Sequence, residues 1–101
     1  MSNKTETEND AIFGFPGTPI GAELGDPVTR VIIDEMIVEL RVKEEQVIMN
    51  YVFQTDSPET FKIHVSRVEV HGSNSWDVYF YNYSGGPVNL VVRPYYVFFQ
   101  Q

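Results

Sequence analysis

The chain has 101 residues, an apolar fraction of 43% and no cysteine. This length predicts one globular domain, without a disulfide framework or thiolate chemistry. The net charge of −7 argues against a nucleic-acid binder, because such a protein needs a basic surface to replace phosphate counterions. There is no signal-peptide pattern and no apolar run of roughly 18 residues that could span a membrane. We therefore expect a soluble, cytoplasmic protein with neither a nucleic-acid nor a membrane partner.

The first 27 residues divide into two parts. Residues 1–10 are polar and charged after the initial methionine, and we expect them to be disordered. Residues 11–27 mix Gly and Pro, which prevent regular structure, with apolar side chains that favour burial. This composition predicts an arm that lies extended across its own subunit or a neighbour, with Phe13, Phe15 and Ile20 in grooves. The remaining residues, 28–101, are expected to form a single β domain.

The first clear strand pattern covers residues 35–43. Apolar residues share one parity (Met36, Val38, Leu40 and Val42) and charged residues share the other (Glu35, Glu39, Arg41 and Lys43). This alternation predicts a half-buried strand. A helix over residues 32–45 also fits part of the apolar spacing, but it places Val38 and Val42 among charged residues and has no clear cap. The strand is therefore the favoured interpretation.

Turn signals separate the strands that follow. A tight turn at 44–45 leads into a second single-parity apolar set, formed by Val47, Met49, Tyr51 and Phe53. Residues 55–58 are a stronger turn signal, because Asp, Ser and Pro favour turn conformations. In the next strand the alternation slips after Val65 and resumes at Val68, which predicts a bulge or bend near residues 66–67.

Nine of the fourteen aromatic residues lie in the last quarter of the chain, in runs at 76–83 and 95–99. Only two charged residues, Asp77 and Arg93, accompany them. Both runs predict strands, and Pro94 implies an edge position or a bulge because it cannot donate a ladder hydrogen bond. Strands joined by short turns build antiparallel sheets. We expect an all-β fold, a small antiparallel β-sandwich or barrel of about five to seven strands with an extended N-terminal arm.

Each aromatic run presents aromatic rings on both faces, since successive side chains of a strand alternate. In the first run, one face is expected to be core (Trp76, Val78, Phe80 and Asn82), and the other carries a tyrosine row. A single small core covers only one face, so the surplus predicts an interface or a ligand site. The candidate interface or ligand residues are Phe13, Phe15, Tyr79, Tyr81, Tyr83, Tyr95, Tyr96 and Phe98.

No pattern points to catalysis or to a cofactor. Glu69 and His71 have a spacing compatible with metal binding, but metal sites need three or four ligands and no third is evident. His71 and His64 are therefore expected to be surface histidines. Neither a nucleophile motif nor a phosphate-binding glycine loop is present. We expect neither an enzyme, nor a metal site, nor a cofactor.

Three functional hypotheses remain. The first is a non-enzymatic β-sandwich that acts through protein–protein interaction, self-associating through its aromatic strands and the N-terminal arm. The second is a carbohydrate or small-ligand binding module that uses the tyrosine row as a platform. The third is an acidic inhibitor or nucleic-acid mimic that binds a basic protein.

Overall fold

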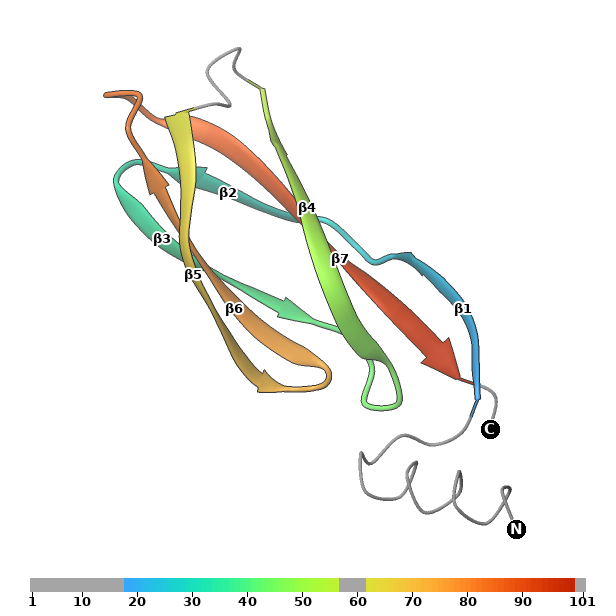
Figure 1. Cartoon of the computed structure of the whole chain (residues 1–101). Helices are drawn as coiled ribbons and strands as arrows, with labels where there is room; N and C mark the ends of the chain where they lie inside the picture. The colour runs from blue at the N-terminus through green and yellow to red at the C-terminus, as the bar shows by residue number, and fades with distance from the viewer. Residues whose placement is uncertain (1–17, 57–61, 100–101) are drawn as a thin grey trace, which may run out of the picture.

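The computed structural model describes residues 18–56 and 62–99, which form two antiparallel sheets packed face to face (Figure 1). The strands are β1 (Pro19–Leu24), β2 (Val28–Ile32), β3 (Glu35–Arg41), β4 (Val47–Thr55), β5 (Ile63–Gly72), β6 (Ser75–Asn82) and β7 (Val88–Phe99). The predicted all-β sandwich is confirmed. Over the described ranges, no helix has the length and apolarity needed to cross a membrane.

The two aromatic-rich runs become the central strands of the two sheets. In the first, sheet A, β7 pairs with β4 on one side and with β1 and β2 on the other. In the second, sheet B, β6 lies between β3 and β5. A central strand has two paired edges, and in this sandwich one of its faces also lies against the core, so it is the position best suited to aromatic and β-branched side chains.

Pro94 lies in the middle of β7, which is paired on both sides, so of the two predicted alternatives, an edge position or a bulge, the edge position is wrong. Antiparallel residues direct their N–H and C=O to the same side, and Pro94 accepts a 2.7 Å bond from the Gly25 N–H. Its missing donor therefore faces the gap where β2 follows β1 (Figure 1). The Gly25 carbonyl accepts a 2.8 Å bond from Arg93 Nε instead. Pro94 is tolerated in a central strand because the strand beside it is interrupted between β1 and β2, where no ladder hydrogen bond from Pro94 is needed.

The core lies between the sheets. It consists of buried aliphatic and aromatic side chains from six strands (Ile32, Val38, Leu40, Ile48, Ile63, Val78, Phe80, Val88, Leu90 and Val92). The predicted core row is confirmed, because Val78 and Phe80 are fully buried and Trp76 packs against them. Phe53 of sheet A meets Phe80 of sheet B edge to face, with ring centroids 5.2 Å apart, a favoured aromatic geometry.

Residues 35–41 form a strand that buries Val38 and Leu40, so the helical alternative is wrong. The tight turn that follows is present, closed by a 2.9 Å bond from the Gln46 N–H to the Lys43 carbonyl. It does not join a hairpin, because β3 belongs to sheet B and β4 to sheet A. The chain instead crosses from one sheet to the other at this turn.

Register shifts interrupt three of the described strands, β1, β4 and β5. In β5 the register shifts between Val65 and Arg67, which confirms the predicted bulge, and again between Val70 and Gly72. In β4 it shifts between Ile48 and Asn50, so Met49 has no partner in β7. The predicted set places Val47 and Met49 on the buried face, but Ile48 is the buried residue. The set is therefore wrong for the residues before this bulge.

The predicted arm at residues 11–27 is in part a strand of the sandwich. Residues 19–24 form β1 and pair with β7 of the same chain, and Ile20 is exposed rather than held in a groove. Phe13, Phe15 and the predicted tail at 1–10 lie outside the described residues.

Candidate interaction surfaces

The structure does not bring the candidate residues into one site. The tyrosine row lies on the outer face of sheet B (Tyr79, Tyr81 and Tyr83), Tyr95 lies on the outer face of sheet A, and Tyr96 and Phe98 point toward the inside. Two outer faces and two pockets result, and the two faces differ sharply in charge and apolarity.

The outer face of sheet A is nearly uncharged and rich in apolar side chains. The strand register places Leu24, Val31, Val52, Val91, Tyr95 and Val97 on it, together with the polar Thr29, Asn50, Gln54 and Asn89. Four of these side chains are 40–51% exposed (Leu24, Val31, Val52 and Tyr95). Among the strand positions that the structure describes on this face, Arg93 is the single charged residue, and its Nε is already bonded to the Gly25 carbonyl. We call this surface the apolar face.

The apolar face also contains a small depression. A pocket of about 190 Å³ lies over the contact of β1, β4 and β7, between Leu24, Val52 and Val91, with Arg93 at its wall. Apolar side chains around a shallow hollow are the usual make-up of an interface centre, where an aromatic or aliphatic side chain of a partner inserts.

The outer face of sheet B is charged. Three acidic residues lie directly opposite one another across its strands: Glu39 on β3, Asp77 on β6 and Glu69 on β5. Glu39 and Glu69 each have an arginine neighbour, with N–O distances of 3.0 Å for Arg41–Glu39 and 3.2 Å for Arg67–Glu69, and Asp77 lies 2.9 Å from His71 Nε2. Like charges in register are destabilising, and the two arginines offset part of that repulsion.

The tyrosine row on this face is not a row of free rings. The Tyr79 hydroxyl donates a 2.7 Å bond to Glu69, and the Arg67 guanidinium lies over the Tyr79 ring, 4.3 Å from its centroid. This cation–π contact covers one face of the ring. Tyr81 and Tyr83 remain, with centroids 4.5 Å apart. The platform predicted from three tyrosines is thus reduced to two.

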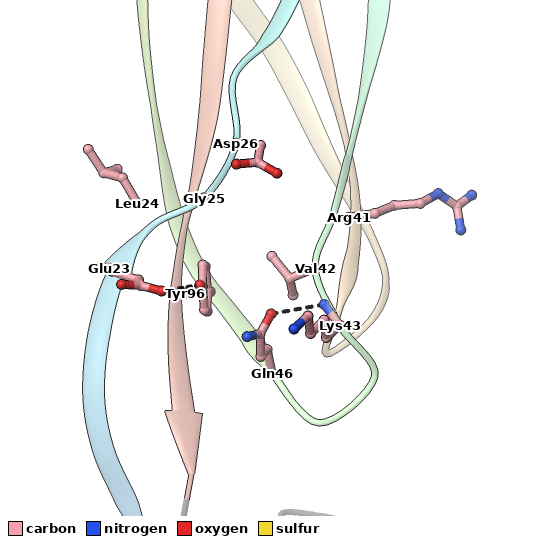
Figure 2. Close-up of a pocket in the computed structure, with 9 residues that line it drawn as sticks. All are labelled: Glu23, Leu24, Gly25, Asp26, Arg41, Val42, Lys43, Gln46 and Tyr96. Carbon is pink, nitrogen blue, oxygen red and sulfur yellow. Dashed lines mark hydrogen bonds between the residues drawn. The ribbon is translucent and has the colours of Figure 1, made fainter.

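A larger pocket opens at one end of the sandwich (Figure 2). It has a volume of about 560 Å³ and lies between the β1–β2 junction, the end of β3 and the turn into β4. Figure 2 shows Asp26, Val42 and Gln46 pointing into the space between the two sheets, whereas Arg41 points away from it. Gln46 is held by a 2.9 Å bond from the Lys43 N–H.

Tyr96 forms one wall of this pocket, and its hydroxyl is one of the polar groups that line it. Its hydroxyl donates a hydrogen bond to Glu23 Oε1. This bond, with burial as the second cause, raises the pKa of Tyr96 above its ordinary value. The phenol therefore stays neutral and serves as a donor, while Glu23 and Asp26 supply carboxylates. The pocket can accept a small polar ligand through hydrogen bonds.

The sequence pattern alone does not reveal Asp77 as a neighbour of Glu69 and His71. The sequence pattern places Asp77 in the aromatic strand only. Asp77 comes close to Glu69 and His71 because β5 pairs with β6 across a two-residue turn. The short loop at residues 73–74 between two alternating segments is the signal from which this hairpin register follows. The structure thus places a third potential metal ligand, Asp77, beside Glu69 and His71.

Comparison of the chain with protein-family models, with curated proteins and with solved structures finds no match in any of the three. Function is therefore inferred from the surfaces of the chain itself. The apolar face of sheet A, the charged face of sheet B and the end pocket are the three surfaces to weigh.

Proposed function

We propose that this protein is a non-enzymatic β-sandwich that acts through protein–protein interaction and self-associates through the apolar face. One observation carries the proposal: side chains such as Val31 and Val52 are about half exposed on a face where Arg93 is the single charged residue of the described strands. Several exposed large apolar side chains on one nearly uncharged face are typical of an interaction site.

Charge favours a second copy as the partner. Two chains that each carry −7 repel wherever acidic surfaces meet. On the charged face of sheet B, the row of Glu39, Asp77 and Glu69 would meet its own copy. On the apolar face the described strand positions carry no acidic residue, and Asp56 reaches its edge only where it bonds to Asn89. Two copies therefore meet fewer acidic groups there than on sheet B. Face-to-face packing of two sheets buries such faces, and a two-fold axis makes the patch self-complementary.

The proposal is tested with a matched pair of substitutions in the full chain. Val52 and Ile37 are 47% and 49% exposed, on the outer faces of sheets A and B respectively. Val52→Lys places an ammonium group in the interface, and we expect the dissociation constant to rise at least about 10-fold, which corresponds to about 1.4 kcal/mol. Ile37→Lys should change the free energy of association by no more than about 0.5 kcal/mol.

Lysine makes this comparison strict, because both variants lower the net negative charge equally. Weaker assembly of Val52→Lys cannot then arise from increased repulsion between chains. Light scattering across a dilution series gives the mass and the dissociation constant. A wild-type chain that stays monomeric at every concentration overturns the proposal, as does equal weakening by the two variants.

A second candidate is a carbohydrate-binding surface at Tyr81 and Tyr83, beside His64. The Tyr81–Tyr83 contact and the 65% exposure of Tyr83 favour it, because sugars stack on exposed aromatic rings. Loss of retention on a glycan column in Tyr83→Ala, with unchanged mass, would support this function. The acidic-mimic hypothesis stays a prediction, and the arginines paired with Glu39 and Glu69 on sheet B weaken the negative potential that it needs.

A further inference from the structure

Three metal-ligating side chains converge on the outer face of sheet B. Glu69 on β5 lies opposite Asp77 on β6. His71 is two residues further along β5, toward the turn that joins the two strands. His71 Nε2 is 2.9 Å from Asp77 Oδ2. The ligand atoms of all three residues lie within 4.8 Å of one another.

We propose that Glu69, His71 and Asp77 form a binding site for a divalent transition-metal cation such as Zn²⁺. One imidazole nitrogen and two carboxylate oxygens are a donor set that suits this class of metal. Three protein ligands with water in the fourth position are the arrangement of open zinc sites. Glu69 and Asp77 are direct partners across β5 and β6, and His71 lies at the register shift between Val70 and Gly72, beside the turn that joins these strands. Strand pairing therefore positions two of the three ligands, and the bulge turns the third toward them.

The distances allow the site to close by side-chain movement alone. Zinc–ligand bonds of about 2.0–2.2 Å in a tetrahedron separate the ligand atoms by about 3.4 Å. The His71–Asp77 pair is already closer than this, and the widest separation has to shrink by roughly 1.4 Å. The side chains that would move are partly exposed, 51% for His71 and 39% for Glu69. Asp77, at 20%, is the most enclosed of the three.

Two further residues contact the two carboxylate oxygens of Glu69. The Tyr79 hydroxyl donates to Glu69 Oε1 at 2.7 Å, which orients the carboxylate as outer-shell hydrogen bonds do in metal sites. Arg67 contacts the other oxygen at 3.2 Å. Its positive charge competes with a cation for the same carboxylate. Tyr79 is thus a positioning residue that favours binding, and Arg67 is an antagonist.

The site is tested by calorimetric titration of the full chain with zinc chloride. We expect one cation per chain, and we expect His71→Ala and Asp77→Asn to weaken binding by about 10-fold or more. His64→Ala is the matched control, because His64 lies on the same strand and the same outer face, and it should leave the affinity unchanged. Equal losses in the His71 and His64 variants overturn the proposal.

Two substitutions separate a metal site from a surface ion pair. Tyr79→Phe should weaken zinc binding by about 10-fold, as loss of an outer-shell partner does, whereas Arg67→Gln should strengthen it. A second measurement uses no variant: zinc should shift the imidazole signals of His71 in the spectrum of the wild-type chain and leave those of His64 in place. Unchanged His71 signals at excess zinc show that the cluster is an ion pair only, which refutes the proposal.

Discussion

Asn82 should contribute more to stability than any other polar residue at the surface or in the core of the described strands. Of the polar and charged residues that the structure describes, it is the buried one, 4% exposed. Its amide nitrogen donates to the carbonyls of Ile32 (2.9 Å) and Gly86 (2.8 Å), and its oxygen accepts from the Ser84 N–H (2.8 Å). These bonds join the β2–β3 corner to the β6–β7 loop, where the chain passes between sheets.

Asn82→Ala removes all three hydrogen bonds. At about 0.5–1.5 kcal/mol each, and with buried backbone groups left unpaired, the loss should be about 2–4 kcal/mol. That is a large part of the roughly 5–15 kcal/mol typical of a domain. Asn82→Asp should be at least as harmful, because a carboxylate oxygen would face the Ile32 and Gly86 carbonyls.

Urea unfolding of the full chain measures these differences, with Asn89→Ala as the control. Asn89 is exposed and donates to Asp56 at 2.5 Å, so its removal should cost less than about 1 kcal/mol. The reasoning is refuted if Asn82→Ala is no more destabilising than Asn89→Ala, or if Asn82→Asp is as stable as the wild type.

Two further predictions follow from the β1–β2 junction and the end pocket. In Gly25→Ala the new Cβ would lie 2.9 Å from the ring of Pro94, so unfolding should become easier by about 1–3 kcal/mol in urea; equal stability of Gly25→Ala and the open control Gly72→Ala would contradict this. The pKa of Tyr96 is raised above its ordinary 10.0, chiefly by the hydrogen bond to Glu23. The stability from this bond is therefore complete below the unfolded pKa and is lost as the pH rises through the folded value. Ultraviolet titration should show ionisation of Tyr96 at lower pH in Glu23→Gln, with Tyr96→Phe identifying the signal, and an unchanged titration would count against the bond.

The strands themselves were largely predictable, because alternation and turn residues are local signals. The strand at residues 35–41, the bulge near 66–67 and the core row around Val78 and Phe80 all follow from parity. Sequence parity fails where a bulge has no local signal. Met49 is an unpaired residue between apolar neighbours, so the sequence alternation looks unbroken there. The bulge nevertheless moves the following residues of β4 to the opposite face of the sheet.

The candidate surfaces were less predictable, because they depend on which strands become neighbours. Pro94 could be placed in a central strand only once the gap at Gly25 was known. The meeting of Glu69 with Asp77 likewise depends on the β5–β6 register. The surplus of aromatic residues predicts an interface or a ligand site, and this stays a prediction. Tyr81 and Tyr95 lie on the outer faces of different sheets, and aliphatic residues such as Val52 make up much of the apolar face.

The central claim is that two copies of the chain meet through the apolar face. The most direct test is the methyl spectrum of the full wild-type chain, recorded over a range of protein concentrations. We expect the signals of Val31, Val52 and Val91 to shift as the concentration rises, while those of Ile37 on sheet B stay in place. Signals that are constant at all concentrations, or shifts confined to Ile37, would contradict the account.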